Sequence, residues 1–109
     1  MVKKRIVKSI KNYLKAVNQE GIPVKFGVLF GSYAKGKEHE WSDIDLLVVS
    51  SRYDKKWTHK DWAKLWFIAA HTDFRIEPIP VGEKQFKKSR DSMIIEIARQ
   101  EGQIISLAE

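Results

Sequence analysis

The order of apolar and polar residues along the chain predicts alternating helices and strands. Between residues 2 and 17, apolar side chains recur every three or four positions with lysines on the opposite face, which is typical of an amphipathic helix. Gly21 and Pro23 follow, and they favour an end of this helix near residues 18–20. The run VKFGVLF at 24–30 is β-branched and aromatic, and it predicts a strand.

The middle of the chain predicts a strand, a helix and a further strand. The run DIDLLVVS at 43–50 is apolar on both faces beyond its two aspartates, as an interior strand is. Residues 54–71 predict a helix on which Trp62 and Trp66 share one face with two aliphatic residues, so we expect both indole rings to pack in the core. The run DFRIEPIPV at 73–81 predicts a strand whose prolines confine its end to a sheet edge.

The last third of the chain predicts three short elements. Residues 83–90 are expected to form a short turn of helix, residues 92–100 a helix that Gly102 ends, and residues 103–108 a short strand. The resulting order indicates an α+β (mixed α/β) fold with a sheet of about four strands flanked by helices. A length of 109 residues predicts a single domain over 1–109.

Composition and charge narrow the class of protein. A hydrophobic content of 43% supports one core, and the absence of cysteine excludes disulfides, thiol catalysis and cysteine-ligated zinc. The net charge of +6 favours polyanionic partners, although a solvated lysine-rich surface explains it without any partner. Neither a signal-peptide core nor an apolar run near the ~18 residues of a membrane span occurs. We therefore expect a soluble, cytoplasmic protein that does not enter a membrane.

A glycine–serine pair and two aspartates carry the candidate chemistry. Side chains alternate along a strand, so Asp43 and Asp45 project to one face, where their mutual repulsion requires a cation. Mg²⁺ suits such oxygen ligands, with Mn²⁺ as an alternative. Gly31 lets backbone N–H groups approach a phosphate closely, and Ser32 adds a hydroxyl group. The alternative interpretation is an ordinary turn followed by carboxylates that face lysines or cap backbone N–H groups.

Other residues near this pair are candidates for supporting roles. Lys35 or Lys37 can neutralise further phosphate charge, because both follow the glycine–serine pair in the same loop. Trp41 precedes the aspartates and Trp57 lies among lysines, so both are expected to be partly exposed. Asp54 or Thr58 is expected to cap the central helix.

The segments G-S-Y-A-K-G and S-D-I-D-L-L-V-V together resemble the signature of the DNA polymerase β-type nucleotidyltransferase superfamily. The branch that is most similar is the minimal nucleotidyltransferases, which are about as long as this chain. The resemblance is densest over residues 26–50. It implies a small nucleotidyltransferase fold with a mixed sheet, in which Gly31 and Ser32 bind nucleotide phosphates and Asp43 and Asp45 hold Mg²⁺.

The resemblance also implies a third carboxylate on a neighbouring strand, which acts as a metal ligand and as general base toward the acceptor. The run DFRIEPIPV offers Asp73 and Glu77, and alternation places both on one face with Arg75. Glu77 is preferred because of its family-like setting RIEPIP, and Asp73 remains the alternative. Many members of the superfamily carry aspartate here, so this glutamate departs from the pattern and its longer side chain can instead pair with Arg75.

Three functional hypotheses follow. The first is an Mg²⁺-dependent enzyme that transfers a nucleoside monophosphate, AMP from ATP, to a hydroxyl acceptor. The second is a binding subunit, because minimal nucleotidyltransferases resemble one half of toxin–antitoxin modules whose partner is a small, all-helical HEPN-type protein; a homo-oligomer is the other expected assembly. The third, a nucleic-acid-binding module, rests on charge alone, and the lysine groups at 3–5, 55–56 and 87–88 are scattered over several elements.

Overall fold

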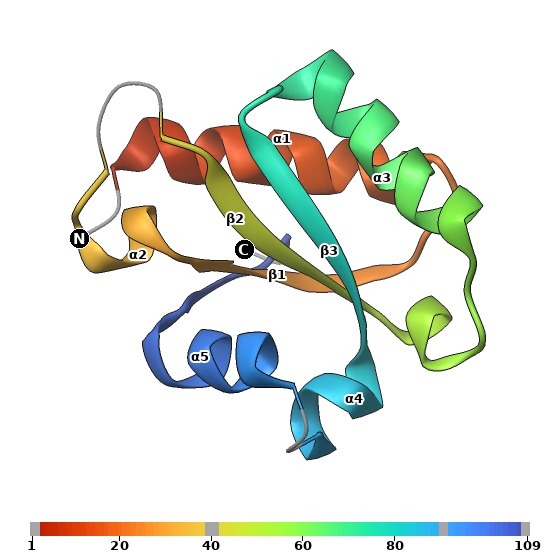
Figure 1. Ribbon diagram of the computed structural model, residues 1–109. Helices are drawn as coiled ribbons and strands as arrows, with labels where there is room; N and C mark the ends of the chain where they lie inside the picture. Colours follow the sequence, from red (N-terminus) through yellow and green to blue (C-terminus); the bar gives the residue numbers. More distant parts are fainter. Residues whose placement is uncertain (1–2, 39–41, 90–91, 108–109) are drawn as a thin grey trace.

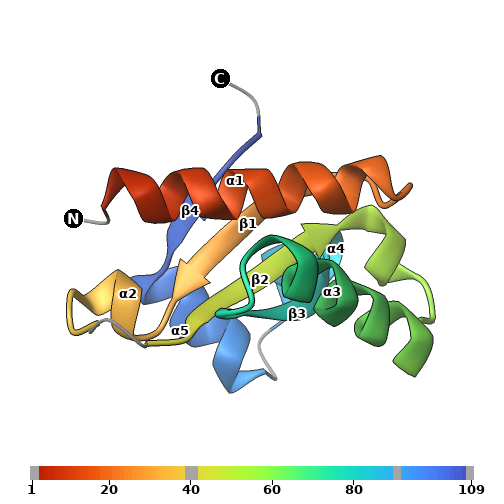
Figure 2. The ribbon, with the colours of Figure 1, turned by 90° about the horizontal axis from the view of Figure 1, so that it is seen from above.

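The computed structural model of the protein is a four-stranded mixed sheet with helices on both faces (Figures 1 and 2). The structure describes residues 3–38, 42–89 and 92–107. The elements in chain order are α1 (Lys4–Gln19), β1 (Val24–Phe30), α2 (Ser32–Lys35), β2 (Ile44–Ser50), η1 (Ser51–Asp54), α3 (His59–Thr72), β3 (Ile76–Gly82), α4 (Glu83–Lys88), α5 (Met93–Glu101) and β4 (Gln103–Ile105). The predicted α+β fold is therefore confirmed. No helix within the described ranges is long and apolar enough to cross a bilayer.

The sheet has the order β3-β2-β1-β4. Strand β1 pairs antiparallel with both β2 and β4, whereas β2 and β3 are parallel. A parallel pair needs a crossover, and α3 supplies it. Helices α1 and α3 pack on one face of the sheet, while α4 and α5 pack on the other (Figure 2). The sheet therefore separates two hydrophobic cores.

Helix α1 follows the predicted pattern closely. Its buried residues are Ile6, Ile10, Tyr13, Leu14 and Val17. The helix ends at Gln19, two residues before Gly21, which has a φ of 91°. A buried hydrogen bond from the Tyr13 hydroxyl to the carbonyl oxygen of Leu65, at 3.0 Å, joins α1 to α3. The apolar stripe of α1 is thus fixed against both the sheet and the second helix of its layer.

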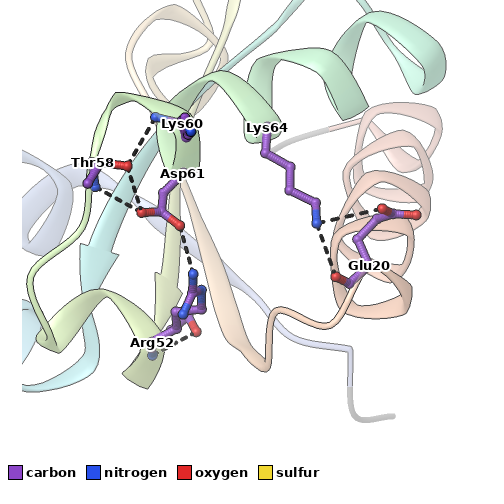
Figure 3. A network of polar contacts seen from close by, with 7 residues as sticks. Glu20, Arg52, Thr58, Lys60, Asp61 and Lys64 are labelled. Carbon is purple, nitrogen blue, oxygen red and sulfur yellow. Dashed lines mark hydrogen bonds and ion pairs between the residues drawn. The ribbon is translucent and has the colours of Figure 1, made fainter.

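The central helix starts later than predicted, because Thr58 forms an N-terminal cap and the helix begins only after it. The Thr58 hydroxyl accepts a hydrogen bond from the backbone N–H of Lys60, and Asp61 accepts one from the N–H of Thr58 at 2.8 Å (Figure 3). Arg52 pairs with the same Asp61 carboxylate at 2.8 Å. This capping box fixes the first helical residue at His59. Of the residues predicted to begin the helix, Asp54 ends the 3₁₀ turn η1, and residues 55–58 form neither helix nor strand.

Asp54 caps a different helix from the one predicted. Its carboxylate accepts hydrogen bonds from the backbone N–H groups of Lys84 and Gln85 at the start of α4. Of the two proposed caps of the central helix, only Thr58 has this role. Asp54 instead ties η1 to the helix that follows β3.

The prediction that Trp62 and Trp66 pack in the core is wrong. Each has 40% of its surface exposed, whereas Leu65 and Ala69 are buried. The two rings lie edge to face, 6.2 Å apart, and Trp62 Nε1 donates to the carbonyl oxygen of Pro78 on the edge strand β3. The sheet ends at β3, and within the described ranges no further strand lies beyond it. Trp57 is 39% exposed, as predicted; Trp41 lies outside the described residues.

Strand β3 starts three residues later than predicted and lies at a sheet edge, as its prolines indicate. It pairs with β2 from Ile76 to Gly82 without interruption. Prolines fit there because the backbone of Pro78 faces away from β2: its carbonyl oxygen accepts from Trp62. The late start has consequences for Asp73, which caps the end of α3.

Candidate active site

The register of three strands brings Asp45 and Glu77 side by side. Phe30 pairs with Asp45 across β1 and β2, and Asp45 pairs with Glu77 across β2 and β3. Residues that pair directly point to the same face, so Phe30, Asp45 and Glu77 lie side by side across the sheet. All three are half-buried, whereas Leu47 in the next row is fully buried. We call Asp43, Asp45 and Glu77 the carboxylate row; it lies on the face that α4 and α5 cover.

Asp43 is the third member of the carboxylate row and occupies the position directly before β2. It is exposed and lies two positions before Asp45, on the same face of the chain. A hydrogen bond between the carboxyl groups of Asp43 and Glu77, together with burial and the negative charges of Asp43 and Asp45, raises the pKa of Glu77 to about 7. Burial, and then the charge of Asp43, raises the pKa of Asp45. Asp43 is therefore close enough to Asp45 and Glu77 to oppose the ionisation of both.

The donor chemistry of the row fits a hard divalent cation. Carboxylate oxygens are the protein ligands that Mg²⁺ and Mn²⁺ take, and a cation would relieve the repulsion that raises the two pKa values. Here the hydrogen bond between Glu77 and Asp43 relieves part of that repulsion. Among the residues that the structure describes, no three Asp, Glu or His side chains converge on one point as the ligands of a bound metal do. The row is thus a set of suitable donors that a cation would have to draw together.

Gly31 brings the end of β1 against Asp45. Its φ of 77° and ψ of −150° are accessible to glycine and costly for other residues. A Cβ atom at this position would lie 2.2 Å from Asp45 Oδ2, which is well inside van der Waals contact. Ser32 follows as the first residue of α2 and is half-buried. The predicted phosphate-binding pair therefore borders the carboxylate row directly.

Lys35 lies one helical turn after Ser32 and is held in an ion pair. Its Nζ atom is 3.2 Å from Glu101 Oε1 at the end of α5. Both side chains are about half exposed, so solvent screens the pair and a phosphate can compete for the lysine. Lys37, the alternative, is exposed. Of the two lysines, Lys35 is the one that links the glycine–serine turn to the helix layer below the sheet.

Asp73 takes part in a different network from the carboxylate row. Its carboxylate accepts hydrogen bonds from Ser9 Oγ of α1 at 2.6 Å and from Arg75 Nη2 at 2.7 Å. The hydrogen bond from Arg75, supported by the one from Ser9 and opposed by burial, lowers the pKa of Asp73 to about 2. Because β3 begins only at Ile76, strand alternation does not extend back to Asp73 and Arg75. The contacts of Asp73 connect α1 to the turn before β3.

Two residues next to the glycine–serine turn were not anticipated as structural neighbours from the sequence. Phe30 is an aromatic residue that pairs with Asp45 across β1 and β2. Tyr33 is 6% exposed, fixes α2 in the core and lies 3.4 Å through its hydroxyl from Arg75 Nη1. Their position on either side of Gly31-Ser32 is the only sequence signal that could have found them.

Comparisons with known proteins bear on the family and the fold of the chain. Residues 10–107 match the model of a family described as nucleotidyltransferase domain. A search of curated protein sequences finds no match. A candidate nucleotidyltransferase from Sulfolobus solfataricus is similar in structure, with a TM-score of 0.64 and 19% identity over 92% of this chain and 78% of that one. A toxin–antitoxin structure with AMP-PNP has a TM-score of 0.61 and 21% identity over 87% of this chain and 71% of that one. Both likenesses concern the fold.

Proposed function

The chain belongs to the nucleotidyltransferase domain family, and from this premise we propose that it transfers a nucleoside monophosphate from a nucleoside triphosphate, ATP in the first instance, to a hydroxyl acceptor. The observation that carries the proposal is the pairing of Asp45 with Glu77 directly beside Gly31. This arrangement puts carboxylate donors next to a turn that a phosphate can approach. Both halves of a phosphate-transfer site are thereby supported by contacts between residues far apart in the chain.

In the proposed reaction, Gly31 and Ser32 hold the triphosphate and Lys35 offsets part of its charge. The acceptor oxygen forms a bond to the α-phosphorus, the bond from that phosphorus to the bridging oxygen breaks, and pyrophosphate leaves. Glu77 takes the proton of the acceptor hydroxyl, because its carboxylate lies beside Asp45 at the edge of the proposed phosphate site. A divalent cation held by Asp43, Asp45 and Glu77 would neutralise charge on the departing phosphates. Positioning of the two reactants supplies much of the rate.

The test is transfer of label from [α-³²P]ATP in the presence of Mg²⁺, with a cell extract as the source of acceptors. We expect a labelled product with the wild-type protein and a loss of at least 100-fold in the double variant Asp43→Asn/Asp45→Asn. Glu20→Gln serves as the control, because it removes an exposed carboxylate that pairs with Lys64 outside the site. Equal label transfer by the wild-type protein and the double variant would overturn the proposal.

A second function, binding of a protein partner, is supported by the aromatic surface of α3. We define this surface as Trp62, Trp66 and Phe67, which are 40%, 40% and 65% exposed. Exposed aromatic groups of this size are typical of protein interfaces. One solved structure with a similar fold is a toxin–antitoxin assembly. We therefore propose that this surface receives a small helical protein of the HEPN type, with a second copy of the chain as the alternative occupant.

Co-expression with a small helical protein encoded beside this chain tests the second function. The wild-type protein is expected to elute with its partner in size-exclusion chromatography, and Trp66→Glu/Phe67→Glu is expected to elute alone. Met93→Glu is the matched control, because Met93 is 77% exposed on α5, on the other side of the sheet. Elution of the wild-type protein as a monomer without the partner would exclude this function and leave the transferase proposal intact.

A further inference from the structure

The excess positive charge of the chain is concentrated in and just before helix α1. The chain has 20 lysines and arginines and 14 aspartates and glutamates. Six basic residues and no acidic residue fall within residues 3–19, so the remainder of the chain has fourteen residues of each sign. The six are Lys3, Lys4, Arg5, Lys8, Lys11 and Lys15. The whole net charge of +6 is therefore that of one helix and its N-cap, although the lysine groups looked scattered in the sequence.

Four of these residues form a straight line along the outer face of α1. Lys4, Lys8, Lys11 and Lys15 are separated by four, three and four positions, a spacing that places them on one side of a helix. With a rise of 1.5 Å per residue, the line is about 16 Å long. We call these four residues the lysine stripe. Together with Val7 and Asn12 the stripe lines an open groove of about 350 Å³.

The stripe has no acidic counterpart in the described part of the chain. None of the ion pairs formed within residues 3–38, 42–89 and 92–107 includes a basic residue of α1. The first turn of α1 contains no acidic residue, although the positive end of the helix dipole favours one there. Like charges three and four positions apart also repel one another. This distribution therefore lowers the stability of the helix, and a bound polyanion would reverse that cost.

We propose that the lysine stripe of α1 binds the phosphate backbone of a nucleic acid without regard to its sequence. Each strand of a duplex presents one phosphate per ~3.4 Å along its axis, so a stripe of about 16 Å can follow several consecutive phosphates. Lysine, a flexible point charge, suits contacts with phosphates rather than with base edges. Among the described residues that line the groove, Val7 is the one apolar residue, and none is aromatic and available for base stacking.

Other polyanionic partners fit this surface less well. Protein interfaces are depleted in lysine and usually centre on aromatic or aliphatic anchors, which the residues lining this groove lack apart from Val7. A helix that binds a lipid surface inserts an apolar face, whereas the apolar face of α1 is buried against the sheet and α3. The stripe lies in the α1/α3 layer, and the carboxylate row faces the opposite layer. The inference therefore goes beyond the proposed transfer reaction and does not depend on it.

Fluorescence anisotropy with a labelled 20-nucleotide RNA of mixed sequence tests the proposal, in 50 to 200 mM NaCl. We expect the logarithm of the binding constant to fall with the logarithm of salt concentration with a slope of about −3, the value for four phosphate contacts on a single strand. In Lys8→Gln/Lys11→Gln/Lys15→Gln, affinity at 100 mM NaCl should fall about tenfold or more, and the slope should approach −1. A second RNA of different sequence should bind with similar affinity.

The control variant is Lys55→Gln/Lys56→Gln/Lys60→Gln, which removes the same charge from three exposed lysines near and on α3. It should retain binding within about twofold, and circular dichroism checks that both triple variants fold. An equal loss in the two triple variants would mean that binding follows net charge alone and would overturn the proposal. So would an absence of salt-dependent binding, or displacement of the RNA by polyglutamate or anionic vesicles at equal charge concentration.

Discussion

At the scale of single residues, Gly31 brings the glycine–serine turn against the carboxylate row. We predict that Gly31→Ala lowers the free energy of unfolding by about 2–3 kcal/mol, because it combines a strained φ with a Cβ that would contact Asp45 Oδ2. Gly21→Ala is the matched control: Gly21 also has a positive φ, but nothing lies within 4 Å of its added Cβ. Gly21→Ala should lower the free energy of unfolding by about 1 kcal/mol. Urea unfolding measures both, and equal losses would show that the approach of Asp45 adds nothing.

Glu77 is the second residue whose role can be tested alone. We predict that Glu77→Gln lowers nucleotidyl transfer by about 100-fold or more, because an amide neither accepts the proton nor supplies a charged ligand. Glu77→Asp should retain activity within about tenfold, since it keeps a carboxylate beside Asp45. Transfer from labelled ATP measures both variants. Wild-type activity in Glu77→Gln would remove this residue from the reaction.

The motif predicts most of the candidate site residues, but it could not establish how they meet in the fold. The spacing of Gly31-Ser32 and the two aspartates is local, and the structure keeps these residues together. The approach of Glu77 depends on the register of a parallel pair of strands, which the length of the intervening helix and its turn determine. Such a long-range register leaves no mark on a single sequence. For the same reason, the position of Phe30 beside Asp45 was not predicted.

At the scale of elements, Asp73 connects α1 to the turn between α3 and β3. The pKa of its carboxyl group lies at about 2, below the ordinary value of 3.8, mainly because Arg75 donates hydrogen bonds to it. The ionised carboxylate therefore stabilises the fold above about pH 4, and this stabilisation is lost as the pH falls from about 4 through about 2. After a discount for solvent screening, we estimate its size at about 1 kcal/mol.

Urea unfolding of Asp73→Asn as a function of pH measures this contribution. The variant should be less stable than the wild-type protein by a constant amount above about pH 4, and the difference should disappear between about pH 4 and pH 2. Ser9→Ala is the control for the partner on α1: it removes one of the hydrogen bonds and should have a smaller effect in the same direction. A difference that does not change with pH would contradict the assigned ion pair.

Element types were predictable from periodicity, whereas element ends depended on specific hydrogen bonds. The start of α3 is fixed by the capping box of Thr58 and Asp61, which competes with the continuous helical pattern from residue 54. Trp62 and Trp66 satisfied the same periodicity as Leu65 but remain 40% exposed, with Trp62 hydrogen-bonded to the edge strand β3. Periodicity shows which side of a helix is apolar; the width of the sheet decides how much of that side is covered.

At the scale of the whole molecule, the two faces of the sheet carry separate proposed activities. The carboxylate row faces the α4/α5 layer, and the lysine stripe lies on the α1/α3 layer. We predict that the triple stripe variant keeps the transfer activity within about twofold, and that Asp43→Asn/Asp45→Asn leaves the affinity for RNA unchanged within the same limit. Substitutions at two sites that share no contacts and lie on opposite faces of a sheet usually have independent effects on the measured free energies.

The combined variant, with all five substitutions, completes the comparison. Its losses in transfer and in RNA affinity should equal those of the two parent variants, to within about 0.5 kcal/mol after conversion of the measured ratios. A stripe variant that also loses transfer, with its fold intact, would contradict this independence. In that case the nucleic acid on α1 would extend around the end of the sheet to the carboxylate row, and its terminal hydroxyl would be the acceptor.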